Sequence, residues 1–273
     1  MFITLHFIAL VCYGLTVGVV LVPLLRLREA HQSAAVALSL TGVAVLIHFV
    51  ALLDYAKAFG VLPLAGFAPA LSSLAFLLGL LTLAVEWVTR ENAIASVVGP
   101  LVVLVMIVAL ASGFGQAPAT PLRGGSWFVL HVAASLLGLA LMAVAFAAAA
   151  LYLLQHRELK QRRFGVAFQF LPPLEQLDRL NHLALVLGFP VLTLGVILAI
   201  RYVGDLSTSN GGRAAHLGWG LLSWFILGGI AAARMRGALS GRKAALASIV
   251  GFAAVVATYF VLALIAGGGS RFI

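Results

Sequence analysis

Charged side chains are scarce in this chain. Only 9% of its 273 residues are Asp, Glu, Lys or Arg, whereas about 25% is typical of soluble domains. Hydrophobic residues make up 63% of the sequence. A protein with so few charges cannot present most of its surface to water. The composition therefore excludes a large soluble domain and indicates that lipid surrounds most of the chain.

Cysteine and several catalytic patterns are also lacking. Cys12 is the one cysteine, which excludes an intramolecular disulfide, a CxxC redox pair and a cysteine-based zinc site. The sequence shows no Ser/His/Asp pattern, no pair of carboxylates within an apolar run and no phosphate-binding loop. The sequence therefore shows no pattern of catalytic residues for a hydrolytic or nucleotide-driven reaction. We expect a function that does not require an enzyme.

Long apolar runs, in contrast, are abundant. A helix needs roughly 20 apolar residues to cross the hydrocarbon layer of a membrane, and the chain is long enough for eight such spans with short connections. We therefore expect an all-α, polytopic membrane helix bundle that forms a single domain over residues 1–273. The expected spans are residues 2–25, 33–53, 70–89, 93–112, 126–155, 181–202, 215–234 and 244–266.

Basic residues collect on one side of this expected bundle. When the loops alternate between the two sides, 12 of the 17 Lys and Arg residues fall on one side. Because cytoplasmic loops are enriched in Lys and Arg, we expect that side to be cytoplasmic and both termini to lie outside. Topology thus accounts for the net charge of +9, and nucleic acid is not an expected partner. The 12 residues are Arg26, Arg28, Arg90, Arg157, Lys160, Arg162, Arg163, Arg179, Arg234, Arg236, Arg242 and Lys243, against Lys57, Arg123, Arg201, Arg213 and Arg271 on the other side.

Three local structures are expected on the cytoplasmic side. The fifth span is longer than the bilayer requires, so its end should project into the cytoplasm. After it, Pro173 suits the first position of a helix, and leucines at every third position from 174 to 180 predict a short interfacial helix. Glu86 and Arg90, four residues apart on the third span, are expected to form an ion pair.

Four of the seven histidines fall at one level, near the outer boundary. They are His6, His48, His131 and His216, on spans one, two, five and seven. Neutral imidazole is a good ligand for haem iron, and an ionisable group inside a membrane is a functional candidate. A boundary histidine can equally lie among lipid head groups or bond a neighbouring helix. Depth and the possibility of pairing favour a functional role for His48 and His131, with His216 as a weaker third candidate.

Three tryptophans lie at a similar level. Trp127, Trp219 and Trp224 fall in the outer halves of spans five and seven. Indole rings can stack on a flat porphyrin, but tryptophan is also the usual anchor at the membrane interface. The anchor interpretation is the commoner one for Trp127, which stays a candidate cofactor-binding residue.

Several segments resemble the cytochrome c assembly superfamily, which includes CcsA-like proteins. They keep the family's order over roughly the last 150 residues, and the eight-span layout is similar to its HemX/YpjD-type branch. The histidine in the segment 46–48 resembles the one in span two of that branch. The similar segments are 126–132 (SWFVLHV), 135–138 (SLLG), 151–155 (LYLLQ), 171–180, 188–195 (GFPVLTLG) and 241–245 (GRKAA).

The resemblance implies a haem-handling protein of the bacterial inner membrane. Full members of the family hold haem through histidines at an outer tryptophan-rich platform and pass it to apocytochrome c. His131 matches the external histidine before that platform, and His48 matches a histidine within the membrane. The resemblance therefore implies that His48 and His131 line one cavity opening to the outer side and can both coordinate haem iron. The segment 217–224 lacks the family's Trp-rich, Asp-containing signature, and Ala232 stands near the place of the second membrane histidine. The tail segment 267–271 contains no second external histidine, so two of the family's four histidines have no counterpart here.

Three functions are consistent with these patterns. The first is haem binding or haem delivery in cytochrome c biogenesis, with haem as the cofactor and a haem-pathway or cytochrome-assembly protein as the partner. The second is a regulator or scaffold linked to tetrapyrrole synthesis, with the basic segment 156–180 as its cytoplasmic contact. The third is a small-solute transporter.

Overall fold

The part of the chain that the structure describes forms eight long helices and contains no strand. This computed structural model describes residues 1–25, 33–114, 125–162, 165, 168, 170–200 and 212–265. All eight helices are long and apolar enough to cross a membrane, so the predicted all-α membrane bundle is confirmed. The helices are α1 (Phe2–Leu25), α2 (Ser33–Phe59), α3 (Phe67–Thr89), α4 (Ala95–Ser112), α5 (Gly125–Lys160), α7 (Leu174–Ile200), α8 (Gly212–Met235) and α9 (Gly241–Ile265).

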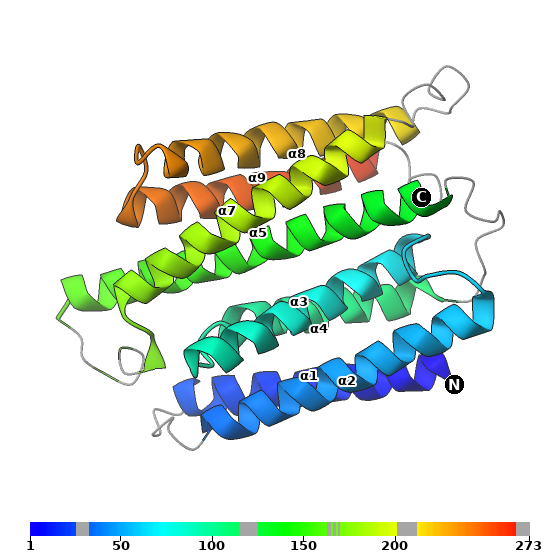
Figure 1. Ribbon diagram of the computed structural model, residues 1–273. Helices are drawn as coiled ribbons and strands as arrows, with labels where there is room; N and C mark the ends of the chain where they lie inside the picture. The colour runs from blue at the N-terminus through cyan, green and yellow to red at the C-terminus, as the bar shows by residue number, and fades with distance from the viewer. Residues whose placement is uncertain are drawn as a thin grey trace.

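The helices pack as two groups of four. Helices α1–α4 form one group and α5, α7, α8 and α9 form the other, and the groups meet mainly where α3 lies against α5 (Figure 1). Successive helices run in alternate directions, so α1 begins and α9 finishes at the same end of the bundle (Figure 1). One cluster of buried hydrophobic residues runs through both groups, from Ala9 in α1 to Val255 in α9.

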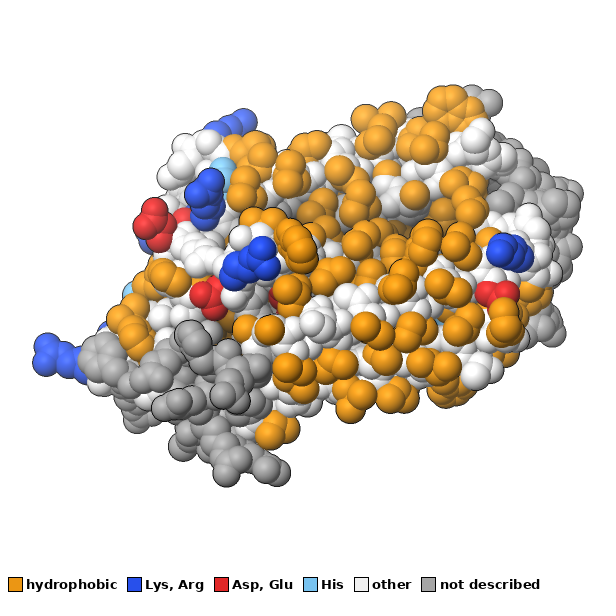
Figure 2. All heavy atoms as spheres, turned by 60° about the horizontal axis from the view of Figure 1, so that its bottom comes forward, with side chains coloured by type: hydrophobic (Ala, Val, Ile, Leu, Met, Phe, Trp, Pro, Cys, Tyr) orange, Lys and Arg blue, Asp and Glu red, His pale blue; other side chains and the backbone are white. Residues whose placement is uncertain are grey.

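The charges lie at the ends of the bundle and not along its sides. Figure 2 shows a broad apolar belt, with most of the visible Lys and Arg side chains beyond one end of it. We call this the cationic end; it lies where α3, α5 and α8 finish and where α7 and α9 begin. The positive-inside rule assigns the cationic end to the cytoplasm. Its described basic residues are Arg90, Arg157, Lys160, Arg162, Arg179, Arg234, Arg236, Arg242 and Lys243.

Two helices extend further than their apolar runs. Helix α2 continues to Phe59, six residues beyond the predicted end, so Asp54 lies within the helix. Helix α5 has 36 residues and is about 54 Å long, well beyond the roughly 30 Å of the hydrocarbon layer. The prediction that α5 projects past the membrane at its cationic end is consistent with this length.

The predicted amphipathic helix after Pro173 is present, but the prediction that it is a short helix separate from the next span is wrong. Residues 174–180 are helical, but they form the first two turns of α7, which continues without a break to Ile200. The expected amphipathic pattern is present, because Leu177 is buried while Glu175 and Arg179 are exposed. Hydropathy marks where the apolar run begins, whereas backbone hydrogen bonds decide where the helix begins, and here the two differ by about two turns.

Glycines allow α5 and α7 to approach closely. A Cβ atom on Gly138 would lie 2.9 Å from the backbone of Leu192, and one on Gly188 would lie 2.9 Å from the Cβ of Leu141. A Cβ on Gly195 would overlap Ser135. These glycines lie in segments 135–138 and 188–195, which carried part of the family resemblance. Small residues at such contacts let membrane helices pack backbone to backbone.

The expected ion pair between Glu86 and Arg90 is absent from the described part of the chain. Arg90 ends α3 in a left-handed conformation, and its N–H donates to the Glu86 carbonyl. Its guanidinium lies 4.9 Å from the centre of the Trp87 ring. An ion pair within the described residues joins Arg234 of α8 to Asp178 of α7, with a nitrogen–oxygen distance of 2.7 Å.

Candidate functional site

Four buried polar residues meet between α1, α2 and α3, toward the end opposite the cationic end. His6 and Tyr13 come from α1, His48 from α2 and Ser72 from α3; we call them the α1–α3 polar cluster. Both Nε2 atoms approach the Ser72 hydroxyl oxygen, that of His6 at 2.9 Å and that of His48 at 3.0 Å. The Tyr13 hydroxyl lies 3.4 Å from Nδ1 of His48. His6, His48 and Ser72 have no exposed surface.

Simple valence rules fix the direction of every hydrogen bond in this cluster when both imidazoles are neutral. Nδ1 of His6 lies 2.8 Å from the Phe2 carbonyl oxygen, which can only accept, so this nitrogen carries the hydrogen. Nε2 of His6 must then accept the one hydrogen of Ser72. The oxygen of Ser72 accepts from Nε2 of His48, and Nδ1 of His48 accepts from Tyr13. The four side chains therefore form one directed chain that ends at the Phe2 carbonyl.

An aromatic shell closes the cluster. Phe114 packs against His6 with ring centres 4.6 Å apart, and Phe76 meets the edge of His48 at 5.7 Å. Phe2 lies between His6, Tyr55 and Phe114. These contacts keep the polar groups in a dry environment, where unsatisfied hydrogen-bonding groups are costly.

Glycine makes room for the tyrosine of the cluster. A Cβ atom on Gly79 of α3 would lie 2.5 Å from the Tyr13 hydroxyl oxygen. Any larger residue at this position would push the ring of Tyr13 aside. The hydrogen bond between Tyr13 and His48 thus depends on the absence of a side chain at Gly79.

His131 occupies a second and different environment, in the group of α5 and α7–α9. It lies in the second turn of α5, half-buried, and its Nδ1 donates to the Gly195 carbonyl of α7 at 2.7 Å. This bond fixes the neutral tautomer, with the lone pair on Nε2. A backbone carbonyl on the other ring nitrogen is the usual arrangement for a histidine that binds a metal, because it orients the ring. The close approach of α5 and α7 at Gly195 places the carbonyl within reach.

The structure does not bring His48 and His131 together. Helix α2 packs against α1 and α3, whereas α5 packs mainly against α7 and α9. In the described residues, His48 has His6 and Ser72 as neighbours, and His131 has Gly195. The expected pairing of His48 with His131 in one cavity is therefore wrong for this arrangement. Equal depth in the membrane does not determine which helices are neighbours.

The structure places the other candidate residues in different environments. The side chain of His216 lies outside the described residues, although its backbone belongs to α8. Trp127 begins α5 with 49% of its surface exposed, as an interfacial anchor or a cofactor contact requires. Trp219 and Trp224 hold helices together, because their indole N–H groups donate to the Val255 carbonyl and to the Thr193 hydroxyl. Trp224 also stacks on Phe189.

Sequence reasoning missed Ser72, Tyr13 and the role of His6 as the partner of His48. A usable signal was present, because a serine and a tyrosine in apolar runs must find partners when helices pack in lipid. Such a signal names the residues that need partners but does not say which partners they find. That information comes only from the packing of α1, α2 and α3.

The α1–α3 polar cluster and the surroundings of His131 differ in how well they fit a haem. The two imidazoles contact each other edge to face, with ring centres 5.5 Å apart, and their Nε2 atoms share the Ser72 hydroxyl, so no porphyrin can lie between them. Both nitrogens of His48 are also engaged in hydrogen bonds. The α1–α3 polar cluster therefore does not fit a macrocycle as arranged. His131 has the chemistry of an iron ligand, because in the neutral imidazole its carbonyl-bonded Nδ1 carries the hydrogen and Nε2 carries the lone pair.

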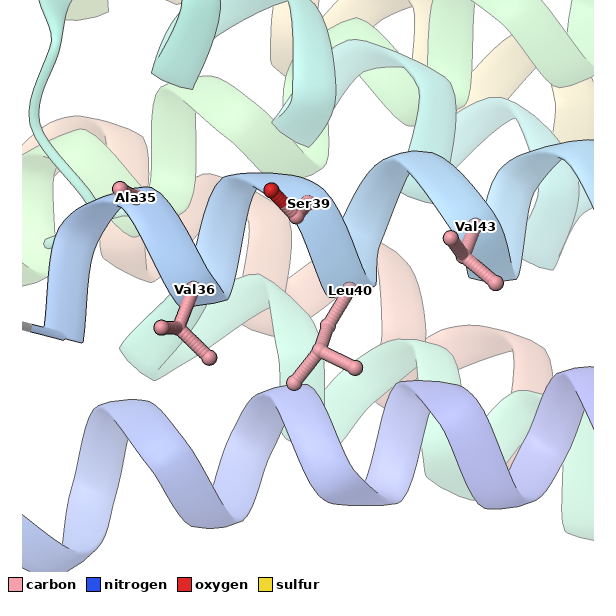
Figure 3. A pocket seen from close by; sticks show the side chains of 5 residues that line it. All are labelled: Ala35, Val36, Ser39, Leu40 and Val43. Atoms are coloured by element: carbon pink, nitrogen blue, oxygen red, sulfur yellow. The ribbon is translucent and has the colours of Figure 1, made fainter.

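Two hollows on the surface are lined by residues outside the α1–α3 polar cluster. A shallow apolar groove of about 340 Å³ lies on α2, where Val36 and Leu40 point toward α1 and Ser39 is the one polar residue of its lining (Figure 3). A smaller hollow of about 200 Å³ at the cationic end is lined in part by Glu86, Arg90 and Asn92. Neither contains a histidine.

Fold and site together define the class of protein: a polytopic helical membrane protein with histidines buried toward one end of the bundle. The family model described as cytochrome C assembly protein matches residues 64–268, and the chain belongs to this family. The chain is 32% identical over 163 residues to an uncharacterized 28.8 kDa protein of Azospirillum brasilense, covering 57% of this chain and 59% of that protein.

Proteins described as cytochrome c biogenesis protein CcsA are also similar. The relative from Gloeobacter violaceus is 32% identical over 94 residues, which cover 34% of this chain and 28% of the relative. The relative from Guillardia theta is 25% identical over 158 residues, which cover 52% of each. The matches thus span between about a quarter and three fifths of the relatives' lengths. Family membership supports a role in cytochrome c biogenesis.

Proposed function

We propose that this protein binds haem and assists its delivery in cytochrome c biogenesis, with His131 as an axial ligand of the iron. The observation that carries the proposal is the 2.7 Å hydrogen bond from Nδ1 of His131 to the Gly195 carbonyl, in a protein of the cytochrome c assembly family. When bound, haem would supply an iron centre that accepts the lone pair of Nε2. The protein's own contribution is to hold this imidazole in one tautomer and one orientation.

The location of His131 suits such a role. It lies six residues after the start of α5, about 9 Å along the helix axis, at the end of the bundle opposite the cationic end. The exposed Trp127 lies one turn before it and offers an indole face to a flat ligand. We place this end on the extracytoplasmic side of a bacterial inner membrane.

An accessory role is favoured over synthase activity. Ala232 of α8 stands where the family resemblance places the second membrane histidine, and an alanine side chain cannot bind iron. His48, the other membrane candidate, is buried between Ser72 and Tyr13. Among the described residues, His131 is the histidine that is oriented for iron, which suits the binding and handing over of haem together with an assembly protein.

An absorption spectrum tests this proposal. The full chain purified in detergent from haem-replete cells should show a Soret band, and His131→Ala should remove it or change the spin state of the iron. His156→Ala is the matched control, because this histidine lies on the same helix near the cationic end and should leave the spectrum unchanged. A colourless wild-type protein, or a Soret band that is the same in His131→Ala, would refute haem binding by His131.

A scaffold linked to tetrapyrrole synthesis is the second candidate. The projecting end of α5 and the start of α9 carry Arg157, Lys160, Arg242 and Lys243 at the cationic end, which suits an acidic partner surface. Recovery of one haem-synthesis enzyme with the wild-type chain, lost when these four residues become Gln, would favour this function. Such binding in a colourless protein would replace the first proposal.

A further inference from the structure

We propose that the cationic end binds a phospholipid with a primary-ammonium head group, phosphatidylethanolamine, between the start of α2 and the end of α3. The site consists of the two surface hollows described above. The smaller one, of about 200 Å³, takes the head group, and we call it the head-group hollow. The apolar groove of about 340 Å³ on α2 takes one acyl chain. This site is separate from His131 and does not depend on haem binding.

Two buried polar side chains in the head-group hollow lack partners among the described residues. They are Glu86, with both carboxylate oxygens, and Asn92, with its amide nitrogen, and the two residues are only 3% and 7% exposed. The Thr41 hydroxyl, which faces Glu86, donates its hydrogen to the Ala37 carbonyl and has none left for the carboxylate. Burying unpaired polar groups is costly, and a carboxylate costs the most. The hollow therefore suits a ligand that brings a hydrogen-bonding cation to Glu86 and an acceptor to Asn92.

The rim of the head-group hollow adds charges of both signs. Arg90 and Glu91 line it and are exposed. Together with Glu86, the lining contains two carboxylates and one guanidinium, so it suits a zwitterion and disfavours a ligand with a net negative charge. Phosphatidylethanolamine offers an ammonium to the carboxylates and a phosphate to Arg90 and Asn92. Phosphatidylglycerol has the phosphate without the ammonium, and the quaternary nitrogen of phosphatidylcholine cannot donate a hydrogen bond.

The two hollows adjoin at the depth where a lipid changes from head group to acyl chain. Ala35 lines both of them. Trp87 of α3 is 61% exposed and contacts the Arg90 guanidinium, as expected at the membrane interface. From Ala35 the groove follows α2 to Val43, about 12 Å along the helix, which is most of the roughly 15 Å of one leaflet (Figure 3). An acyl chain that begins at the head-group hollow therefore has an apolar path along α2.

A lipid-competition measurement tests the site without any variant. The full chain would be reconstituted into vesicles of equal parts phosphatidylethanolamine, phosphatidylglycerol and phosphatidylcholine with the same acyl chains. After extraction in detergent, native mass spectrometry would count the retained lipids. We expect one phosphatidylethanolamine per chain, enriched about fivefold or more over each of the other lipids. Equal retention of the three lipids, preference for another lipid, or no retained lipid would overturn the proposal.

Two variants with matched controls locate the lipid. Glu86→Gln keeps the shape of the side chain and removes its charge, so retention of phosphatidylethanolamine should fall about fivefold or more. Glu175→Gln makes the same change on the exposed surface of α7 at the cationic end and should retain the lipid like the wild type. Ala35→Leu fills the junction of the two hollows and should also reduce retention, whereas Ala253→Leu, at an exposed position of α9, should not.

The variants can also refute the site. Undiminished retention in Glu86→Gln or in Ala35→Leu would show that the lipid binds elsewhere. Displacement of the lipid by free phosphoethanolamine would show that the hollow binds a soluble ligand, and would overturn the assignment to a phospholipid.

Discussion

Replacing Gly138 by alanine is a sensitive test of the seam between α5 and α7. A Cβ at this position would lie 2.9 Å from the backbone N and Cα and from the Cβ of Leu192, well inside the usual carbon–carbon contact of about 3.5–4.0 Å. The obstructing atoms include backbone, so no side chain can rotate away and the two helices must move apart. Overpacking of this kind costs about 1–3 kcal/mol.

A second glycine isolates the packing effect. Alanine also stabilises a helix relative to glycine by up to about 1 kcal/mol, which partly offsets the clash. Gly229 of α8 is the matched control, because a Cβ there would meet nothing within 4 Å. Gly229→Ala should therefore show the propensity gain alone. The difference in unfolding free energy between the two variants should be about 1–3 kcal/mol, with Gly138→Ala the less stable.

The measurement is a reversible unfolding titration with SDS in mixed micelles, followed by the helical circular dichroism signal. If Gly138→Ala is as stable as Gly229→Ala within about 0.5 kcal/mol, the backbone contact between α5 and α7 is not as close as described. Because the same seam sets the bond from His131 to Gly195, Gly138→Ala should also change the Soret spectrum of haem-loaded protein. Gly229→Ala should leave that spectrum unchanged.

Further predictions concern the polar contacts and the topology. Ser72→Ala leaves two buried histidines without their shared partner and should lower the free energy of unfolding by about 1–3 kcal/mol in the same titration. Ser39→Ala, on the lipid-facing side of α2, should leave the stability unchanged. Equal stabilities of the two variants would show that Ser72 does not hold the two histidines. Asp178→Ala leaves the buried Arg234 cation without its carboxylate and should lower the free energy of unfolding by about 3 kcal/mol. Adding Arg234→Leu in a double variant should restore part of that loss. If the losses of the two single variants add up in the double variant, the two residues are not coupled. A reporter fused after residue 162 should be cytoplasmic and one fused to the C-terminus extracytoplasmic, and the reverse pattern would overturn the orientation.

Hydropathy alone was sufficient for the number of helices and for the fold class. Eight runs of apolar residues must each satisfy their backbone hydrogen bonds inside lipid, and a helix does so without help from any other segment. The side on which the basic residues gather also follows from sequence, since charges cannot remain within the hydrocarbon layer. The ends of the helices were harder to predict from the sequence. Helix α7 begins at Leu174 and α2 ends at Phe59, because a helix can continue beyond its apolar run into the interfacial region.

The candidate site, too, could be predicted from the sequence only in part. The sequence by itself determined that His6, His48 and His131 lie near one boundary, because depth is a count of residues along a helix. Only the tertiary structure decided that His48 meets His6 through Ser72 and that His131 meets the Gly195 carbonyl. In lipid the apolar faces of all helices are alike, so hydrophobicity does not select neighbours. The choice depends on close contacts at glycines and on a few interhelical hydrogen bonds, which exist only after the helices have packed.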